Sequence, residues 1–342
     1  MFYIRADGNE TIGMGHIARC MTIAEALQAA GEEVCFLIAD EKPVKVLEER
    51  GFRYEILFTY YDEMDVELPQ LVLKLGTAAG SGKVRILIDS YYVTEFYIKN
   101  LMLQAEVILL DDNADRVLPC HTLVNYNIYA ESLGYAEKYP DSRLVLGATY
   151  APIRSSFAGA PAEIRDEMKH VLVTCGGSDG CHMELALTEA VKNEMLPQNL
   201  VYHLVVGPFS EDGDRLEEET QGDERFCVHR GVSDLSDLMR TCDAAVSAAG
   251  STLYELCAVG LPTIGFTMAS NQHRNMEAFA KLTPIMNAGD FSIAPDAALA
   301  FIAKELTLLA GEPQLRQKIS AAMRSLVDGQ GAKHLAEELL KQ

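Results

Sequence analysis

Short apolar runs and amphipathic stretches alternate along most of the chain. Apolar runs that end at glycine or polar turns predict buried strands, and stretches with apolar residues three or four apart predict helices. In the first half, the predicted strands are residues 2–5, 34–39, 54–57, 84–88, 107–110, 124–125 and 144–146. The predicted helices between them are residues 16–30, 45–50, 68–79 and 96–103. Such an alternation is typical of a parallel sheet covered by helices.

The same alternation begins again after a segment of small residues. Pro152, Gly159 and Pro161 lie in this segment and predict a linker. Beyond it, the predicted strands are residues 170–174, 200–206, 226–229, 243–246 and 263–266. We therefore predict an α/β protein with two Rossmann-like domains. The predicted boundaries are residues 1–150 for the first domain, 151–168 for the linker, 169–325 for the second domain and 326–342 for a C-terminal helix.

The chain is strongly acidic. Its 342 residues include 29 Lys and Arg against 50 Asp and Glu, which gives a formal net charge of −21. This charge argues against a sequence-independent grip on nucleic acid or anionic lipid, so any bound phosphate must be held locally. No apolar run approaches the length of a membrane span, and the N-terminus lacks a signal-peptide pattern. We therefore expect a cytoplasmic protein.

The eight cysteines are scattered and form no Cys-x-x-Cys pair. Most of them lie in or beside apolar runs, which predicts buried free thiols. Cys120-His121 and Cys181-His182 have no further partner at the spacing of metal ligands. We expect neither a metal site nor another cofactor.

The most informative stretch is a small-residue turn at 247–251, between a predicted strand and a predicted helix. Free backbone N–H groups and the helix dipole favour a phosphate at such a turn. Gly250 lets a ligand approach the backbone, and the Ser251 and Thr252 hydroxyls add donors. Glu255 lies on the same helical face as Ser251, where a carboxylate can accept both hydroxyls of a ribose. Alternatively, the turn only caps the helix and Glu255 is a solvated charge.

Other candidate ligand contacts also follow predicted strands. They are Gly176, Gly177 and Ser178, then Gly231 and Val232, and finally the amides Asn271 and Gln272 at the start of a helix. The first group is a second glycine turn that suits a phosphate for the same reason as the first. The turn at 231–232 lies where a base can stack and meet backbone groups.

The first predicted strand leads into a glycine-rich loop that ends at His16. The dipole of the following helix disfavours a protonated imidazole at its N-terminus, so His16 is a candidate general base. Alternatively, His16 only caps the helix. Gly13 and Gly15 weakly match a dinucleotide-binding loop, with Ala18 at the third glycine position, and a cofactor-binding Rossmann domain stays open as a minority interpretation.

Carboxylates follow two further predicted strands of the first half. Asp89 ends one strand, and Asp111 and Asp112 follow the next. Because the carboxyl ends of parallel strands meet at one edge of a sheet, we expect these side chains near His16. They serve as the base, as the partner that orients the histidine, or only as loop caps, and the sequence leaves these roles open.

The segment around Glu255 resembles the nucleotide-sugar motif of the GT-B glycosyltransferases, most closely that of the MurG-like enzymes. The resemblance implies that Glu255 holds the ribose and that Gly250 and Ser251 face the diphosphate. It also implies that Asn271 and Gln272 contact the sugar.

Motifs along nearly the whole chain resemble a narrower group, the PseG/SpsG family. They are Arg5-Ala-Asp7-Gly, Ile12-Gly-Met-Gly15-His16-Ile-Ala-Arg19-Cys20, Asp111-Asp112 with Asp115-Arg116, Tyr150-Ala-Pro-Ile-Arg154, Gly176-Gly177-Ser178-Asp179 and Asp328-Gly-Gln-Gly331. PseG is a UDP-sugar hydrolase of pseudaminic acid biosynthesis, and SpsG proteins belong to spore coat polysaccharide clusters. The resemblance implies a GT-B fold with a cleft between two Rossmann-like domains, of which the second holds UDP. It places Gly13, Gly15 and Arg19 among the substrate contacts and His16 beside the reacting carbon.

The resulting hypothesis is hydrolysis of a UDP-activated 2,4-diacetamido-2,4,6-trideoxyhexose to the free sugar and UDP, with inversion at the anomeric carbon, in nonulosonic acid or surface polysaccharide biosynthesis. His16 activates water and is oriented by Asp7 or a strand-end aspartate. The turns at Gly176 and Gly250 stabilise the leaving diphosphate without a metal. The alternatives are a glycosyltransferase of the same fold, a non-catalytic nucleotide-sugar sensor and a nicotinamide-dependent oxidoreductase.

Overall fold

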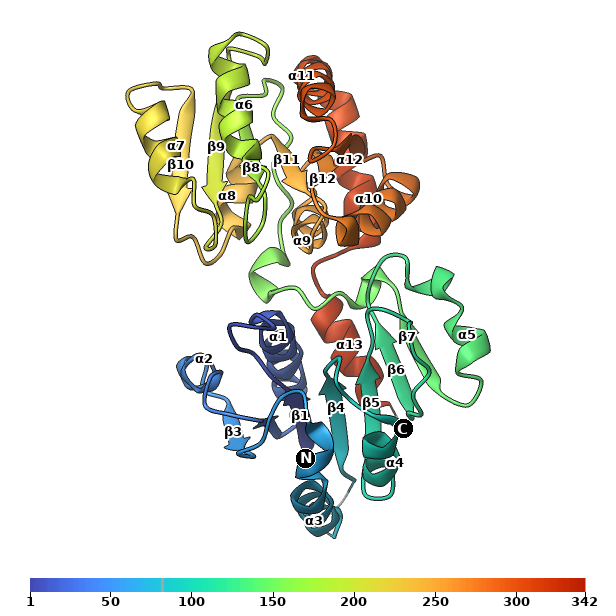
Figure 1. Cartoon of the computed structure of the whole chain (residues 1–342). Helices are drawn as coiled ribbons and strands as arrows, with labels where there is room; N and C mark the ends of the chain where they lie inside the picture. The colour runs from blue at the N-terminus through green and yellow to red at the C-terminus, as the bar shows by residue number, and fades with distance from the viewer. Residues whose placement is uncertain (81–82, 342) are drawn as a thin grey trace. The chain divides into compact units, whose positions relative to one another are not determined.

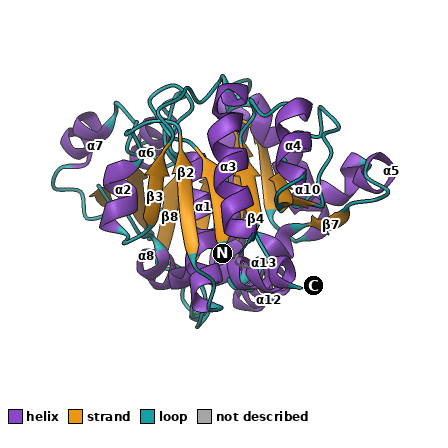
Figure 2. Ribbon diagram, turned by 90° about the horizontal axis from the view of Figure 1, so that it is seen from below, coloured by secondary structure: helices purple, strands orange, loops and turns teal. Residues whose placement is uncertain are grey.

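The computed structural model describes residues 1–80 and 83–341. The chain divides into two compact units, one formed by Met1–Ile153 with Gln330–Gln342 and the other by Arg154–Gly329. Each unit contains one parallel sheet with helices packed against it (Figure 1). Helices and strands (Figure 2) alternate along most of the chain, as the apolar pattern predicts.

The first unit has a seven-stranded sheet in the order β3-β2-β1-β4-β5-β6-β7. Its strands are β1 (Phe2–Ala6), β2 (Val34–Ile38), β3 (Arg53–Ile56), β4 (Arg85–Asp89), β5 (Glu106–Leu110), β6 (Thr122–Asn125) and β7 (Arg143–Leu146). Its α-helices are α1 (Gly15–Ala29), α2 (Val44–Glu49), α3 (Leu68–Ala79), α4 (Glu95–Met102), α5 (Tyr135–Lys138) and α13 (Gly331–Leu340). Because β1 pairs with both β2 and β4, the carboxyl ends of β1 and β4 form a topological switch point, where open α/β sheets bind their ligands.

Each face of the first sheet carries its own core, because successive strand residues point to opposite faces. Tyr3 and Ile86 belong to one core, which also contains residues of α3 and α4. Ile4 and Leu87 belong to the other core, which contains residues of α1 and α13. Strands buried on both faces are apolar at most positions, and for this reason they appear in the sequence as nearly continuous apolar runs.

The last helix of the chain belongs to the first unit. Leu335 and Leu339 of α13 are fully buried in the core beside α1. Gly331 begins the helix at a point where a Cβ atom would lie 2.2 Å from the carbonyl oxygen of Ala151, so the close approach requires glycine. The helix expected at 326–342 thus begins at Gly331, and residue 342 lies outside the described residues.

The second unit has a six-stranded sheet in the order β10-β9-β8-β11-β12-β13. Its strands are β8 (His170–Thr174), β9 (Val201–Val206), β10 (Phe226–Arg230), β11 (Ala244–Ala248), β12 (Thr263–Thr267) and β13 (Met286–Asp290). Its α-helices are α6 (Met183–Lys192), α7 (Gly213–Thr220), α8 (Ser236–Thr241), α9 (Thr252–Val259), α10 (Ser270–Leu282), α11 (Pro295–Gly311) and α12 (Pro313–Leu326). Here β8 pairs with both β9 and β11, so the switch point lies between β8 and β11.

The sequence patterns missed some elements and displaced others. β13 was not predicted, because Met286–Asp290 is a half-exposed edge strand without an apolar run. The helix expected at 16–30 spans Gly15–Ala29, and the helix expected at 45–50 spans Val44–Glu49. The residues from Arg154 onward that were expected in the linker group with the second unit. None of the described helices is long and apolar enough to cross a membrane.

Three histidines form a hydrogen-bonded row across the second sheet. His203 on β9 lies between His170 on β8 and His229 on β10, with N···N distances of 3.0 and 2.9 Å. A neutral His203 satisfies both neighbours, because it has one N–H donor and one lone pair, whereas a protonated ring has two donors. Burial and the like charges of its neighbours lower the pKa of His203 to about 4.

This row predicts a loss of stability in acid. An unfolded histidine has a pKa of about 6.5. Between that pH and about 4, the unfolded chain binds more protons than the folded chain. The free energy of unfolding therefore decreases as the pH is lowered through this range. His203→Gln keeps one donor and one acceptor and is expected to weaken this dependence. Urea unfolding of both proteins at neutral and at acid pH measures it, and equal acid losses would contradict the prediction.

Candidate functional site

The switch point of the first unit brings a histidine and an aspartate together. His16 lies at the start of α1, which follows β1, and Asp89 is the last residue of β4. His16 Nδ1 lies 2.7 Å from Asp89 Oδ1, and the two residues are 8% and 1% exposed. The sheet order therefore determines this pair, because β1 and β4 are neighbours although 73 residues separate the two side chains.

The proton on His16 can be placed from its partner. Burial opposes ionisation of Asp89, but the Arg19 guanidinium and the hydrogen bonds from His16 and Arg19 outweigh burial and hold its pKa at about 2. The Asp89 carboxylate is then only an acceptor, so His16 Nδ1 carries the hydrogen of this contact. In the neutral ring, Nε2 keeps a lone pair that can accept a proton.

Arg19 is committed to the same cluster. Its Nε donates to Asp89 Oδ2 at 2.6 Å, Nη2 donates to Asp89 Oδ1, and Nη1 donates to Asp112 Oδ2 at 2.6 Å and Tyr126 Oη at 3.0 Å. Its side chain is 14% exposed. The sequence placed Arg19 among the substrate contacts, and the structure shows its donors engaged by protein carboxylates and a phenol.

The structure assigns different contacts to the aspartates whose roles were open. Asp89 orients His16. Asp112 binds Arg19 and also accepts the Tyr91 hydroxyl at 3.1 Å. Asp111 caps its own loop by accepting the N–H groups of Asn113 and Ala114 at 3.0 and 3.2 Å.

Asp7, the other expected partner of His16, is engaged elsewhere. Its carboxylate accepts Arg5 Nη1 at 2.5 Å and the N–H of Ala39 at 2.8 Å. Arg5 is fully buried and also forms an ion pair with Glu67. Asp7 therefore ties β1 to the end of β2, and the contact that orients His16 comes from Asp89.

Two features complete the surroundings of His16. The loop before it turns at Gly13, whose φ of +72° favours glycine, and a Cβ atom on Gly13 or Gly15 would meet no protein atom within 4 Å. The ring of Tyr91 packs edge-on against His16 at a centroid distance of 4.8 Å and an angle of 77°. Sequence reasoning missed Tyr91, although its position two residues after the strand-end Asp89 was a usable signal.

The second unit has a pocket at its own switch point. Its empty volume is about 920 Å³, part of it open solvent, and it includes eight of the predicted ligand contacts. They are Gly176, Gly177, Ser178, Val232, Gly250, Ser251, Thr252 and Gln272. Sequence reasoning missed other lining residues, among them Gly207, Pro208, Phe209 and Met268.

Close backbone approaches shape this pocket. Gly176 has a φ of +81°, and a Cβ atom on Gly207 would lie 2.3 Å from the Gly176 carbonyl oxygen, so both positions require glycine. A Cβ atom on Gly250 would meet no protein atom within 4 Å, so the space above this turn is open. Asn275 supports the turn, because its Nδ2 donates to the carbonyl oxygens of Ala249 and Gly250 at 3.0 and 3.3 Å.

Three predicted contacts lie outside the residues that line this pocket, namely Gly231, Glu255 and Asn271. Glu255 on α9 faces Arg154, with 3.9 Å between Oε1 and Nη2. Burial raises the pKa of Glu255 to about 7, and Arg154 opposes this rise. Arg154 also donates to the carbonyl oxygen of Ser233, next to the pocket residue Val232.

Known proteins resemble this chain in sequence. The chain is 21% identical to the spore coat polysaccharide biosynthesis protein SpsG of Bacillus subtilis (strain 168) over 335 residues, which are 96% of this chain and 94% of SpsG. It is 24% identical over 276 residues to the pseudaminic acid cytidylyltransferase and UDP-2,4-diacetamido-2,4,6-trideoxy-beta-L-altropyranose hydrolase of Helicobacter pylori (strain ATCC 700392 / 26695). That match covers 80% of this chain and 45% of the longer protein. No protein-family model matches the chain.

The solved structures show the fold. MurG of Acinetobacter baumannii superimposes with a TM-score of 0.66 at 13% identity, over 100% of this chain and 99% of that one. The protein therefore has the GT-B fold of two Rossmann-like domains, as the sequence predicts. Among the described residues, no group of three or more His, Cys, Asp or Glu side chains is arranged to hold a metal ion.

The Asp89 contact predicts one tautomer of His16. In the wild-type protein, the neutral ring is expected to carry its hydrogen on Nδ1, because Asp89 accepts it. Asp89→Asn removes the charge that selects this tautomer, so the fraction with hydrogen on Nε2 rises. Nitrogen-15 NMR of the imidazole measures both forms. Asp111→Asn is the matched control, and an Nε2–H majority in the wild-type protein would contradict the assignment.

Proposed function

Because this chain belongs to the PseG/SpsG group of the MurG-like GT-B superfamily, we propose that it hydrolyses a UDP-activated 2,4-diacetamido-2,4,6-trideoxyhexose to the free sugar and UDP. The observation that carries the proposal is the His16–Asp89 pair at the switch point of the first unit, with Nε2 of the neutral ring left to accept a proton. The coarser assignment, an enzyme of polysaccharide biosynthesis that uses a UDP-sugar, rests on the relatives.

The second unit is proposed to hold UDP. The turns at Gly176 and Gly250 meet in one pocket, and the second of them opens α9. The backbone N–H groups and the positive end of the α9 dipole suit the diphosphate. Glu255 is proposed to accept the ribose hydroxyls, and Asn271 and Gln272 to contact the sugar. With a chain charge of −21, local dipoles of this kind have to supply the attraction for an anionic ligand.

The proposed reaction is an inverting displacement. His16 Nε2 takes a proton from water while the water oxygen forms a bond to the anomeric carbon. The bond between that carbon and the diphosphate oxygen breaks, and UDP leaves with its electron pair. The Asp89 carboxylate stabilises the imidazolium, which then releases its proton to solvent. The glycine turns stabilise the charge on the departing UDP without a metal.

A glycosyltransferase is the second candidate, and sequence similarity to a UDP-N-acetylglucosamine transferase of Helicobacter pylori, 35% identical over 135 residues, favours it. In this case the same His16 nitrogen takes a proton from an acceptor hydroxyl instead of water. The two reactions share the fold and the donor, so an assay without any acceptor separates them.

The first test uses the UDP-sugar in buffer without an acceptor. Wild-type protein is expected to release UDP and the free sugar, seen by phosphorus-31 and proton NMR, and the first anomer formed shows whether the configuration inverts. His16→Ala is expected to lose roughly 10²- to 10⁴-fold in turnover, since it removes a general base, while UDP binding is unchanged. Saturable UDP binding without release would refute the hydrolase and favour the transferase.

A second test addresses Glu255 in the nucleotide site. Only the ionised carboxylate can accept both ribose hydroxyls, and its pKa is about 7 in the free protein. The preference for UDP over 2′-deoxy-UDP is therefore expected to grow between pH 6 and pH 8, by roughly tenfold at most for each pH unit.

The comparison of two nucleotides cancels the titration of their own phosphates, and calorimetry measures both affinities. Glu255→Gln is expected to remove the pH dependence of the preference. Glu218→Gln, on the exposed side of α7, is the matched control and keeps the wild-type dependence. The same pH-dependent preference in Glu255→Gln would rule out the ribose contact.

A further inference from the structure

We propose that Arg116 is a positioning residue, which acts by holding Tyr91 against the His16 ring. This inference rests on the proposed function, since it concerns the histidine that takes the proton. Arg116 lies in the loop after β5, and Tyr91 lies between β4 and α4. Arg116 does not touch His16 in any described contact, so its effect has to pass through Tyr91.

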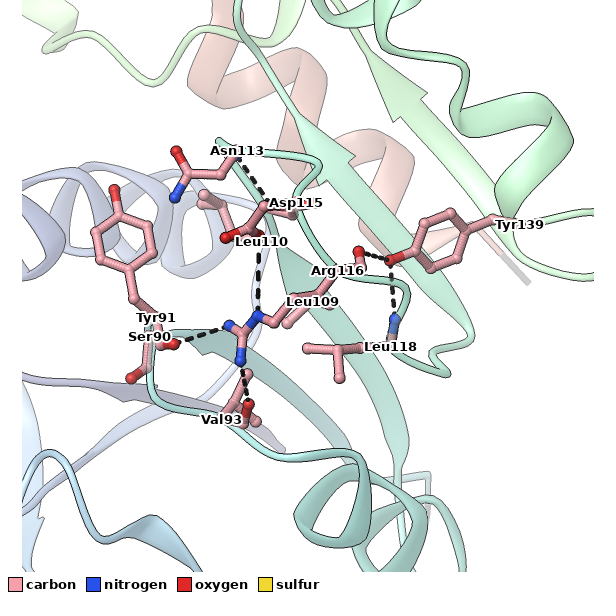
Figure 3. Close-up of a pocket in the computed structure, with 11 residues that line it drawn as sticks. Ser90, Tyr91, Val93, Leu109, Leu110, Asn113, Asp115, Arg116, Leu118 and Tyr139 are labelled. Carbon is pink, nitrogen blue, oxygen red and sulfur yellow. Dashed lines mark hydrogen bonds and ion pairs between the residues drawn. The ribbon is translucent and has the colours of Figure 1, made fainter. Parts of the chain in front are cut away.

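Arg116 forms two hydrogen bonds to the backbone of the segment after β4, and we call this pair of contacts the clamp (Figure 3). Arg116 Nη2 donates to the carbonyl oxygen of Tyr91 at 2.8 Å, and Nη1 donates to that of Val93 at 3.0 Å. The ring of Tyr91 points away from Arg116 in this view. The planar guanidinium supplies two donors in a fixed geometry that matches two carbonyl groups, which a lysine ammonium cannot reproduce.

Besides the clamp, Tyr91 is held by one ring contact and one hydrogen bond from its hydroxyl. Its segment lies outside helices and strands, and Tyr91 is 47% exposed, so packing alone does not immobilise the ring. The ring nevertheless packs edge-on against His16, and its hydroxyl donates to Asp112. Fixing the Tyr91 backbone therefore fixes one wall of the His16 site.

The loop that carries Arg116 is itself held in place by hydrogen bonds. The Arg116 carbonyl oxygen accepts the Tyr139 hydroxyl at 3.4 Å, and that hydroxyl accepts the N–H of Leu118 at 3.1 Å. Asp111 caps the start of the same loop and accepts the Tyr135 hydroxyl at 2.9 Å. A loop anchored at both ends can transmit its position to Tyr91 through the Arg116 side chain.

The decisive experiment measures kcat and KM for hydrolysis of the UDP-sugar by Arg116→Gln. A displaced catalytic group typically costs up to about 10²-fold in rate, so kcat is expected to fall roughly 10- to 100-fold with little change in KM. UDP affinity is expected to stay at the wild-type value, because the nucleotide site is in the other unit. Arg116→Lys is expected to recover part of kcat, since it restores one donor. Arg53→Gln, an exposed arginine on β3, is the matched control.

A double-mutant cycle separates positioning from a merely structural role. If Arg116 acts through Tyr91, Arg116→Gln has little further effect on kcat in a Tyr91→Ala background. Equal effects in both backgrounds, or an unchanged kcat in the single variant, would overturn the proposal.

A second readout is independent of turnover. Arg116→Gln is expected to shift the His16 ring resonances, because the Tyr91 ring leaves its edge-on position. Arg53→Gln is expected to leave them unchanged. If the wild-type protein hydrolyses nothing, the proposed function fails while this NMR shift still tests the clamp. Unchanged His16 resonances in folded Arg116→Gln would overturn it.

Discussion

The Asp89 carboxylate is the group on which the order of the first unit's site depends. It is 1% exposed, and it accepts hydrogen bonds from His16, Arg19 and Cys20. A buried carboxylate costs several kcal/mol unless it is paired, and the two-donor contact with Arg19 supplies that pairing. Arg19 then reaches Asp112, and Asp112 reaches Tyr91. One buried charge thus links side chains from α1 and from the loops after β4 and β5.

The second unit orders its pocket with closely packed backbone rather than with a buried charge. Its pocket is bordered by turns that follow β8, β9 and β11, which the sheet order places side by side. The turns can approach one another only because Gly207 lacks a side chain, and Gly176 adopts the positive φ that its turn requires. Donors built from backbone N–H groups need no counter-charge when the ligand is absent, which suits a strongly acidic chain. The two switch points therefore differ in chemistry although their topology is the same.

The sequence predicted most of the fold, because buried parallel strands are apolar at most positions and contrast with the helices between them. It failed at β13, where an edge strand needs no apolar run. In the site, the sequence placed His16 at the start of a helix and Asp89 near it, but left open whether Asp7 or a strand-end aspartate contacts the histidine. Asp7 is nearer in the chain, whereas Asp89 contacts His16 because the sheet order places β4 beside β1. Strand order is a property of the whole sheet and no local motif contains it. Tyr91 and Arg116 depend on the same long-range order.

The arrangement of charge around His16 fits the proposed hydrolysis. Asp89 divides its hydrogen bonds between His16 and Arg19, and its contact with Nδ1 orients the imidazole. A strong base is required when the leaving group is poor, and less so when the bond to the leaving group is already weakened. A diphosphate held by backbone dipoles is a good leaving group, and a glycosidic carbon develops positive charge before water attacks. For the proposed reaction a well-oriented imidazole is then sufficient, and the main demand on the first unit is geometric. Such a demand explains why so many buried and half-buried contacts converge on the position of one ring rather than on its charge.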